Sequence, residues 1–573
     1  MNKTLCISGV CACVILFPFI QSTGFFHHTL SIILGSLLTS VVVLAFLFLS
    51  YSKRLKINMM DVAVFLFLII SSFGKYETYD PLILVQTTCL FFVYVGFRLL
   101  QTNDILIFII SAILVSCFLQ SVYGALQYYE WMMPKHSFQF LTGSFPNQNI
   151  FAAYICIGIV ICVGLLLWSN CILKNRRYLN VYRIVLACFA VWFACVIILT
   201  ETRAVWMGSM IAIAFLFYIR FLKQVRALRK SVKITSVSII LGLFCMAFFL
   251  LHFSPKKDSS DGRLFIWNVT LQMCAKKPII GQGARSFQMD YLYAQAAYLA
   301  KHPESAGNRL ASNISTPFNE YLKVVYEHGL LGFIIIVIAA ILIIRIENTP
   351  SASILKSCLI ALAVISFFSY PFHFFIFQII GIIFVSLLSD LLLSKSLISI
   401  KTRILALCVC VLMIFTAFYG YDIRNCKKVM VANPADTPYR LNVFQNSYNC
   451  LKNNNEYLNL YVRLLLRHED EASLEQIKRL AIISPNTQVM CDMGDLHKKK
   501  NEYECAETCY MLAHNMVPAK FVPLQKLLLL YVETEQIEKA YQIAYEILKK
   551  PVKVNTNMTD MIKKDAERVL KAH

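Results

Sequence analysis

Thirteen apolar runs dominate the sequence and restrict the chain to a membrane fold. A helix of about 17 to 22 apolar residues is long enough to cross the hydrocarbon core of a bilayer. The runs lie near residues 5–22, 29–50, 58–73, 82–100, 104–123, 149–168, 183–201, 203–221, 234–253, 329–346, 353–370, 374–393 and 402–420. The pattern predicts an all-α, polytopic membrane helical bundle of about 12 to 13 spans.

The composition agrees with this class. Hydrophobic residues make up 58% of the chain and charged residues 15%, whereas soluble domains carry roughly 25% charge. The formal net charge of +21 is large enough to suggest nucleic-acid binding. Membrane proteins, however, need cationic cytoplasmic loops for their orientation, so the positions of the charges decide between the two explanations.

The basic residues gather on one side of the predicted bundle. With the N-terminus in the cytoplasm, the cytoplasmic connections hold most of the cations: Lys53, Arg54, Lys56, Arg98, Lys174, Arg176, Arg177, Arg183, Arg220, Lys223, Arg226, Arg229, Lys230, Lys233, Arg345, Lys356, Lys395, Lys401 and Arg403. The short outer connections hold little beyond Lys75, Lys135 and Arg203. The basic excess therefore orients the protein, and nucleic acid is not an implied partner.

This orientation divides the chain into four regions. Residues 1–253 hold spans one to nine, 254–328 form a large extracytoplasmic loop, 329–420 hold the last four spans, and 421–573 form an extracytoplasmic tail. The first apolar run lacks an A-x-A-type cleavage site and is interpreted as a retained helix. A loop as long as 254–328 between membrane spans is rarely a passive connector, so we expect the functional motifs there.

The tail has the composition of a soluble helical domain. Segments 486–518 and 519–553 each have the pattern of a helical hairpin, with alanines at the helix crossings and a period of about 34 residues, which is typical of tetratricopeptide repeats. A less regular pair is expected within 436–485. Such repeats present concave surfaces to protein partners, and a simple helical cap on the membrane domain is the alternative.

Two connections at the outer side of the membrane domain carry polar candidates. One reads L-T-G-S-F-P-N-Q-N before a span; it is either a turn in which Asn149 caps the helix, or a substrate-binding lip that includes Asn147 and Asn149. The other is L-T-E-T-R-A-V-W, where two spans meet. Ionisable residues at such a depth usually face a wet cavity or a partner. We interpret Arg203 as an anion ligand, with a Glu201–Arg203 pair at the interface as the alternative.

The large loop is expected to contain short helices. From Arg263 to Met273, an amphipathic helix is predicted to lie on the membrane surface, with Arg263 in its first turn after Gly262. Trp267 lies on its apolar face, and Arg285 follows the glycine-rich segment I-I-G-Q-G-A. We expect Trp267 and Arg285 to contact substrate. The nearby tyrosines and glutamines, from Gln288 to Tyr298, suit a sugar.

The cysteine pattern does not predict a metal centre. Of the twenty cysteines, most lie in or beside apolar runs, where a small apolar side chain usually serves packing. Cys505 and Cys509 are one helical turn apart, a spacing that rarely suits a disulfide. Cysteine and histidine do not recur at a zinc-type spacing, so neither a metal nor a cofactor is expected.

Several motifs together resemble the bacterial O-antigen ligase and O-antigen polymerase superfamily, which includes pilin-type O-oligosaccharyltransferases. They are T-G-S-F-P-N-Q-N-I-F-A-A-Y, T-R-A-V-W, D-G-R-L-F-I-W, K-P-I-I-G-Q-G-A-R-S-F and F-N-E-Y-L-K-V-V-Y-E-H-G-L-L-G. The resemblance covers about Gly124 to Gly332 and extends to the order of spans, outer loop and helical tail. It implies transfer of a glycan from a polyprenyl diphosphate carrier to an acceptor at the outer face of the bacterial inner membrane.

The resemblance also implies residue roles. By motif position, the two arginines that serve the carrier's diphosphate in the family correspond to Arg203 and Arg263. The family's histidine before the Asn of an H-N-x-x-L-type motif corresponds to Phe318, which cannot act as a base. Glu320 is therefore the first candidate for a general base and His328 the second, with a helix-start carboxylate and interface packing as the respective alternatives. Asn319 is a candidate for substrate binding.

Three functions remain open at this stage. One is an O-antigen ligase-like glycosyltransferase, acting on a glycan, lipid or protein acceptor. A second is a polysaccharide polymerase or protein O-oligosaccharyltransferase with the same chemistry. The third is a transporter or flippase, which is disfavoured because internal repeats and broken helices near the bilayer midplane are not evident. A partner protein bound by the tail is compatible with each.

Overall fold

The computed structural model describes residues 3–20, 25–49, 55–100, 103–133, 141–172, 176–221, 257–392, 396–398, 402–431, 437–552 and 556–571. The chain forms two compact units. Unit 1 comprises Met1–Phe73, Asp80–Pro255 and Phe318–Lys427. Unit 2 comprises Gly74–Tyr79, Lys256–Pro317 and Lys428–His573.

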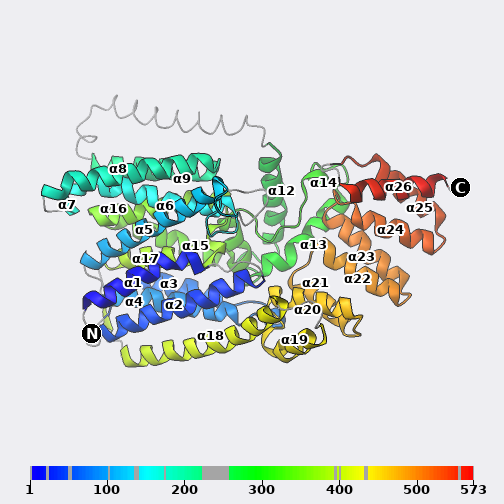
Figure 1. Cartoon of the computed structure of the whole chain (residues 1–573), viewed down its shortest axis with the longest axis horizontal. Helices are drawn as coiled ribbons and strands as arrows, with labels where there is room; N and C mark the ends of the chain where they lie inside the picture. The colour runs from blue at the N-terminus through cyan, green and yellow to red at the C-terminus, as the bar shows by residue number, and fades with distance from the viewer. Residues whose placement is uncertain are drawn as a thin grey trace. The chain divides into compact units, whose positions relative to one another are not determined.

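Unit 1 is a helical bundle (Figure 1), which confirms the predicted all-α class. Its elements are α1 (Lys3–Leu16), η1 (Phe17–Ile20), α2 (His27–Leu49), β1 (Leu55–Ile57), α3 (Met59–Ser72), α4 (Leu82–Leu100), α5 (Asn103–Tyr128), α6 (Gln148–Leu167), α7 (Ser169–Ile172), α8 (Arg176–Leu199), α9 (Arg203–Arg220), α15 (Glu320–Arg345), α16 (Pro350–Phe368), η3 (Pro371–His373), α17 (Phe375–Ser389), β2 (Ser396–Ile398) and α18 (Thr402–Val431). The strands β1 and β2 pair antiparallel over three residues each.

The predicted apolar runs form helices wherever the structure describes them. Among the described residues, nine helices are long and apolar enough to cross a membrane: α2, α4, α5, α6, α8, α9, α15, α16 and α18. Helices α1 and α3 have 14 residues and α17 has 15. The predicted run 234–253 lies outside the described residues.

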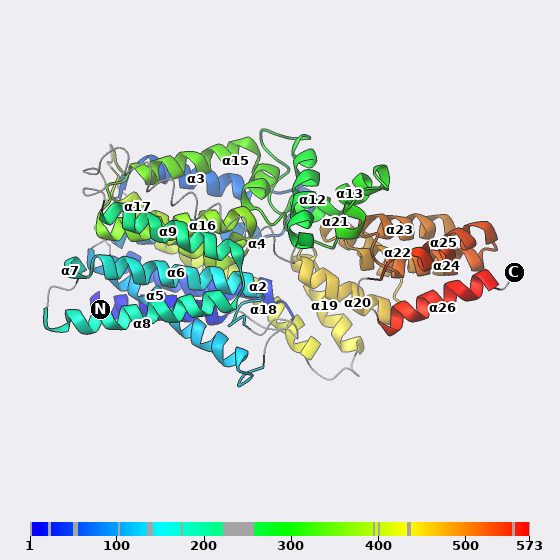
Figure 2. The same cartoon turned by 90° about the horizontal axis from the view of Figure 1, so that it is seen from above.

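Helix α6 lies at the centre of unit 1 and packs against α5, α8, α9 and α16 (Figure 2). Fifteen of its 20 residues are buried. Glycine allows helices to approach closely at two places. A Cβ atom on Gly164 would lie 2.5 Å from Ile354 Cγ1, and one on Gly208 of α9 would lie 2.9 Å from the carbonyl oxygen of Ala361. Larger side chains there would push α16 away from its neighbours.

A buried ionic cluster joins three helices at one end of the bundle. Arg98, at the end of α4, pairs with Asp61 at 2.9 Å and with Asp390, just after α17, at 2.6 Å. The Tyr94 hydroxyl donates to Asp61 at 2.6 Å, and Asn58 and Asp61 form a capping box at the start of α3. The buried guanidinium is satisfied by two carboxylates, which is the condition for tolerating its burial.

Unit 2 combines the large loop with the tail. Its elements are η2 (Tyr76–Thr78), α12 (Lys257–Cys274), α13 (Ser286–Lys301), α14 (Gly307–Leu310), α19 (Thr437–Leu451), α20 (Asn455–His468), α21 (Ser473–Ile483), α22 (Thr487–Lys499), α23 (Tyr503–Met516), α24 (Val522–Glu533), α25 (Ile537–Lys549) and α26 (Asn557–Lys571). The loop therefore forms short helices, as expected. From α19 to α26, each helix contacts the next one along the chain.

The tail helices fall at the predicted hairpins. Helices α22 and α23 lie within 486–518, and α24 and α25 lie within 519–553. A side chain at Gly494 would lie 2.4 Å from the ring of Tyr510, so these two residues bring α22 and α23 into close contact. The assignment of these hairpins to the tetratricopeptide family stays a prediction.

Helix α13 is the element through which the loop binds the tail. The Tyr293 hydroxyl donates to the carbonyl oxygen of Ala481 at 2.9 Å, and Gln295 Nε2 donates to that of Met516 at 2.6 Å. Lys75 contacts Asp290 at 2.7 Å from the short segment Gly74–Tyr79. The tyrosines and glutamines from Gln288 to Tyr298 suggested a sugar site. Some of them instead hold unit 2 together.

Candidate functional site

Four helices of unit 1 begin at the same end of the bundle: α6, α9, α15 and α17. The Asn147 side chain, before α6, donates to the Tyr370 hydroxyl at 3.1 Å, just before η3 and α17. Gln148 Nε2 donates to the carbonyl oxygen of Thr200 at 2.9 Å, at the corner between α8 and α9. The backbone N–H of His373 donates to Glu320 Oε1 at 3.1 Å, at the start of α15. These contacts connect four segments that are far apart in the sequence.

The cap of α6 is Asn147, and the expectation that Asn149 caps this helix is wrong. The Asn147 Oδ1 atom accepts the backbone N–H of Ile150 at 3.0 Å. Asn149 is the second residue of α6, and its side chain is exposed. The helix starts two residues earlier than predicted because Asn147 adopts the extended conformation of a cap, with φ of −151° and ψ of 161°.

The corner between α8 and α9 presents Arg203. Thr200 and Thr202 are buried, and their hydroxyls form a hydrogen bond at 2.9 Å across the turn. Glu201 between them has a φ of 48°, in the left-handed region, and its side chain is exposed. Arg203 follows as the first residue of α9 and is half-buried. The two threonines therefore fix the turn from which the arginine extends.

The start of α15 holds Glu320 in place. Asn319 caps the helix, because its Oδ1 atom accepts the backbone N–H groups of Tyr321 and Leu322, each at 3.0 Å. Glu320 is the first helical residue and is buried. Phe318 before it has a φ of 54°, and its ring meets that of Tyr370 edge-on at 5.1 Å. The carboxylate thus lies in a position where a helix N-terminus favours negative charge.

His328 lies two turns further along α15. It is 7% exposed, and its ring packs edge-on against Phe67 of α3, with the ring centroids 5.9 Å apart. Among the described residues, its Nδ1 atom has no hydrogen-bond partner. Gly329 follows with φ of 67° and ψ of −171°, which separates the segment from Glu320 to His328 from the rest of α15. Within the described part of the chain, the ring contact of His328 is with Phe67, whereas Asn147, Tyr370 and Glu320 belong to the contacts at the starts of α6, α15 and α17.

Tyr370 and His373 are candidates that the sequence patterns did not reveal. The Tyr370 ring lies 6.0 Å from that of His373, and the His373 ring lies 5.1 Å from that of His28 on α2. Both residues belong to S-Y-P-F-H-F-F, which interrupts two apolar runs. A proline flanked by tyrosine and histidine between two spans was the available signal.

Unit 2 carries the remaining candidates. Helix α12 begins at Lys257, so Gly262 is inside it. The prediction that Arg263 lies in the first turn is therefore wrong. Arg263 is half-buried. The Trp267 indole N–H donates to the carbonyl oxygen of Pro317 at 3.0 Å, which orients the ring. Arg285 precedes α13 with a φ of 61°.

The glycine-rich segment before α13 has a glycine pair that allows a tight turn or a close approach to a ligand, and it makes a tight turn. Gly281 and Gly283 have φ values of 72° and 97°, and residues with side chains rarely adopt such angles. The backbone N–H of Ser286 then donates to the carbonyl oxygen of Gly283 at 3.2 Å. Whether this turn also approaches a ligand stays a prediction.

Part of the chain matches a known family. Residues 188–337 match the family model for O-antigen ligase. The chain carries an O-antigen ligase family domain. This domain extends from α8 into α15 and includes Arg203, Arg263 and Glu320. No curated protein matches the chain in sequence.

The match to the O-antigen ligase family indicates a membrane glycan-transfer function, and the described residues include nine helices that are long and apolar enough to cross a membrane. The polar end of unit 1 is suited to that class of chemistry. Helix N-termini carry partial positive charge, and backbone N–H groups there bind anions such as phosphates. Arg203 adds a permanent positive charge at the first turn of α9. Glu320 supplies a carboxylate that accepts protons.

Proposed function

We propose that this protein transfers a glycan from a polyprenyl diphosphate carrier to an acceptor hydroxyl at the extracytoplasmic face of the bacterial inner membrane. The observation that carries this proposal is the meeting of the α6, α9, α15 and α17 N-termini, with Arg203 and Glu320 among their first residues. Arg203 suits the leaving diphosphate, and Glu320 suits the attacking hydroxyl.

The diphosphate needs charge stabilisation more than it needs a proton. It leaves as a stable anion, and donors that are already oriented lower the barrier where negative charge develops. Arginine remains cationic close to lipid and presents a planar fork of donors to phosphate oxygens. We assign this role to Arg203 of unit 1, and the resemblance implies the same role for Arg263.

The acceptor is activated by removal of its proton. In the proposed step the acceptor oxygen forms a bond to the anomeric carbon, while the bond from that carbon to the diphosphate oxygen breaks. The hydroxyl proton passes to Glu320, and the electron pair of the broken bond leaves with the diphosphate. Direct displacement inverts the anomeric centre. Glu320 is preferred over His328 because His328 packs against Phe67.

The remaining candidates are assigned to the substrate. The Asn319 oxygen is used by the helix cap, which leaves its amide N–H groups for a sugar hydroxyl. Asn149 is exposed at the start of α6. Asn147 positions the site through Tyr370 and adds an amide. In unit 2, Trp267 offers an aromatic face and Arg285 a cation.

The distribution of basic residues supports an extracytoplasmic site. Arg220, at the far end of α9 from Arg203, donates to the carbonyl oxygen of Leu167 at the end of α6. Lys356 bonds the carbonyl oxygens near the end of α15, again away from Glu320. Arg98 lies with Asp390 at the far end of α17. Cations gather on the cytoplasmic side of membrane proteins, so the Arg203 end is the outer one.

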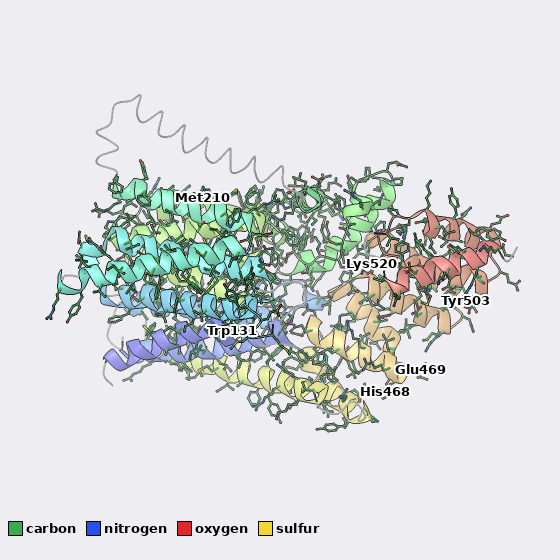
Figure 3. All side chains as sticks on the ribbon, turned by 45° about the horizontal axis from the view of Figure 1, so that its top comes forward. Trp131, Met210, His468, Glu469, Tyr503 and Lys520 are labelled. Atoms are coloured by element: carbon green, nitrogen blue, oxygen red, sulfur yellow. The ribbon has the colours of Figure 1, made fainter. Side chains whose placement is uncertain are left out.

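An aromatic group supports a membrane–water interface at the end of α5. Trp131, which Figure 3 labels, follows α5 and is 80% exposed, and Tyr129, two residues earlier, is 67% exposed. Tryptophan and tyrosine favour the region between the hydrocarbon core and water. Helix α5 ends here. After it, the Ser144 hydroxyl donates to the carbonyl oxygen of Pro18 at 2.7 Å. We therefore assign this end of α5 to a membrane–water interface.

Gene deletion separates the possible acceptors. Lipid-linked glycan, surface polysaccharide and glycoprotein are each measured in the deletion strain and in the strain complemented with the wild-type gene. Loss of a modal-length product on lipid A identifies a ligase, whereas loss of the ladder with one repeat retained identifies a polymerase. Unglycosylated protein identifies an oligosaccharyltransferase. If none of the three products changes, the proposal is wrong.

A further inference from the structure

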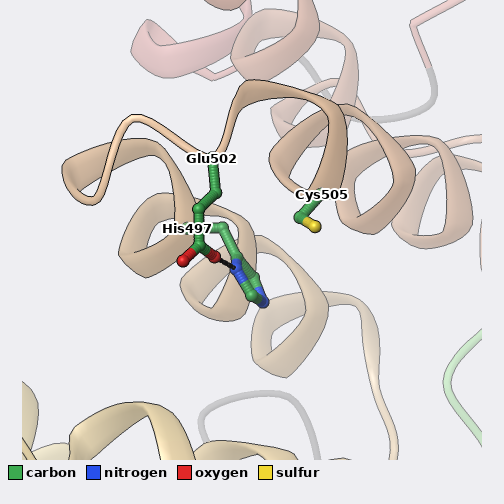
Figure 4. Close-up of side chains that lie close together, drawn as sticks. All are labelled: His497, Glu502 and Cys505. Carbon is green, nitrogen blue, oxygen red and sulfur yellow. Dashed lines mark hydrogen bonds and ion pairs between the residues drawn. The ribbon is translucent and has the colours of Figure 1, made fainter.

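Three side chains with different ligand atoms converge in the turn between α22 and α23. His497 lies in the last turn of α22, Glu502 precedes α23, and Cys505 lies in the first turn of α23 (Figure 4). His497 Nδ1 lies 2.5 Å from Glu502 Oε2. One ligand atom from each of the three residues lies within 4.8 Å of the others.

We propose that His497, Glu502 and Cys505 bind a divalent transition-metal ion of the zinc class. Imidazole, carboxylate and thiolate are the three ligand types that zinc uses, with bonds of about 2.0 to 2.3 Å. In a tetrahedral site such bonds place the ligand atoms roughly 3.3 to 3.8 Å apart. The ligand atoms therefore need to shift by roughly 1 Å to reach a tetrahedral site. The fourth position is left for water or another ligand.

The backbone of the turn holds this arrangement. The N–H groups of Lys500 and Glu502 both donate to the carbonyl oxygen of His497, at 3.0 Å each. Asn501 between them has a φ of 59°, in the left-handed region. His497 is itself 7% exposed. Because the turn is closed by hydrogen bonds and the imidazole is held by burial, two of the three ligands are preorganised.

The local charges are compatible with a cation despite three consecutive lysines. Lys498 pairs with Glu533, and Lys499 pairs with Glu469 at 2.6 Å, so both are directed to other carboxylates. Lys500 and Lys478 remain near enough to act on Glu502. Against them, the bound form has two anionic ligands, the Glu502 carboxylate and the Cys505 thiolate, which together balance a divalent ion.

Binding displaces a proton in a defined way. The Cys505 thiol loses its proton to the buffer when its sulfur forms the metal bond. His497 binds through Nδ1 as a neutral imidazole, with its ring proton on Nε2, and the ion loses water molecules in exchange for the three ligands. The sequence did not predict the site, because the order His, Glu, Cys with four and two intervening residues is not a usual zinc pattern.

The test uses the full-length protein in detergent, stripped of metal and titrated with Zn²⁺ against a chromophoric chelator. We expect wild type to bind one more ion per chain than Cys505→Ser, and Glu502→Gln to bind it at least tenfold more weakly. Cys450→Ser is the matched control, because Cys450 is also an exposed cysteine of the tail. This control is expected to bind as wild type does.

A second measurement identifies the thiolate ligand directly, and its wild-type spectrum tests the proposal without any variant. Wild type loaded with Co²⁺ should show a thiolate-to-cobalt charge-transfer band that Cys450→Ser retains and Cys505→Ser loses. Equal Zn²⁺ stoichiometry in wild type and Cys505→Ser, or a cobalt spectrum without a thiolate band, overturns the proposal. Glycan transfer does not enter either readout, so the result is independent of the proposed function.

Discussion

The backbone N–H of His373 donates to Oε1 of Glu320 at 3.1 Å, across 53 residues of sequence. This contact joins the start of α15 to the break between α16 and α17. It fixes the orientation of a buried carboxylate. A group that is to accept a proton from a substrate hydroxyl needs such a fixed orientation.

Replacing Glu320 with Gln tests this carboxylate. The amide oxygen still accepts the His373 N–H, so the fold should be retained, but the side chain no longer accepts a proton. We expect transfer activity to fall by about a hundred- to ten-thousandfold. Activity is measured as glycan passed from a polyprenyl diphosphate donor to acceptor. Glu347→Gln, an exposed carboxylate after the far end of α15, is the control and should remain active. Equal activity of both variants would remove Glu320 from the mechanism.

Sequence patterns predicted the spans and several residues of the site, for identifiable reasons. Spans depend on runs of apolar residues, which are local. Arg203 was found because a charge at the end of a span is unusual. Glu320 was chosen because it lies two residues after Phe318, which stands at the family's histidine position. Tyr370 and His373 were missed because their role depends on contacts with Asn147 and Glu320 that no local pattern encodes.

Local starts of helices were the other source of error. Asn149 and Asn147 are equally good caps by residue type. The hydrogen bond that Asn147 donates to the Tyr370 hydroxyl distinguishes the two, but it is not visible in the sequence. Similarly, Gly262 suggested a helix start, yet α12 begins at Lys257. A glycine inside an exposed helix costs roughly 1 kcal/mol, which the remaining turns of α12 tolerate.

Gly329 is expected to be irreplaceable. Its φ of 67° and ψ of −171° are strained for any residue with a Cβ, so Gly329→Ala should lower stability by about 1 to 3 kcal/mol. Gly9, inside α1, has no heavy atom within 4 Å of an added Cβ. Gly9→Ala should therefore be neutral or stabilising by about 0.5 to 1 kcal/mol. Thermal unfolding in detergent compares the two variants. A similar melting temperature for both would contradict the claim that the backbone conformation at Gly329 requires glycine.

Native cysteines report the orientation. Cys450 and Cys505 are exposed in the tail, and Cys171 is exposed in α7, between α6 and α8. In intact spheroplasts, a membrane-impermeant maleimide should modify Cys450 and Cys505 but not Cys171. Permeabilised membranes, in which all three should react, provide the control. Peptide mapping by mass spectrometry identifies the modified residues, and the reverse pattern would place the tail in the cytoplasm.

The tail should lose stability in mild acid through His514. Burial, and secondarily the Lys550 charge, lower the pKa of His514 from its usual 6.5 to about 4. At neutral pH the imidazole is therefore uncharged, and its 3.4 Å contact with Glu546 is not an ion pair. As the pH falls from 6.5 to 4, the unfolded chain binds a proton that the folded chain does not, so folding weakens by about 3 kcal/mol at most.

Amide hydrogen exchange of α23 and α25, corrected for its intrinsic pH dependence, measures this loss. His514→Gln should have a smaller change between pH 6.5 and 4 than wild type. His302→Gln, at an exposed histidine after α13, should change as wild type does. An identical response in His514→Gln and wild type would mean that another group causes the acid sensitivity.

The most direct measurement is glycan transfer by purified protein, with polyprenyl diphosphate release and glycoconjugate formation followed together. We expect wild type to produce both in equal amounts. Arg203→Ala should lower kcat/KM by about a hundred- to a thousandfold, while Arg220→Ala, at the other end of α9, should retain activity. Unchanged transfer in Arg203→Ala, or no diphosphate release by wild type, would contradict the account.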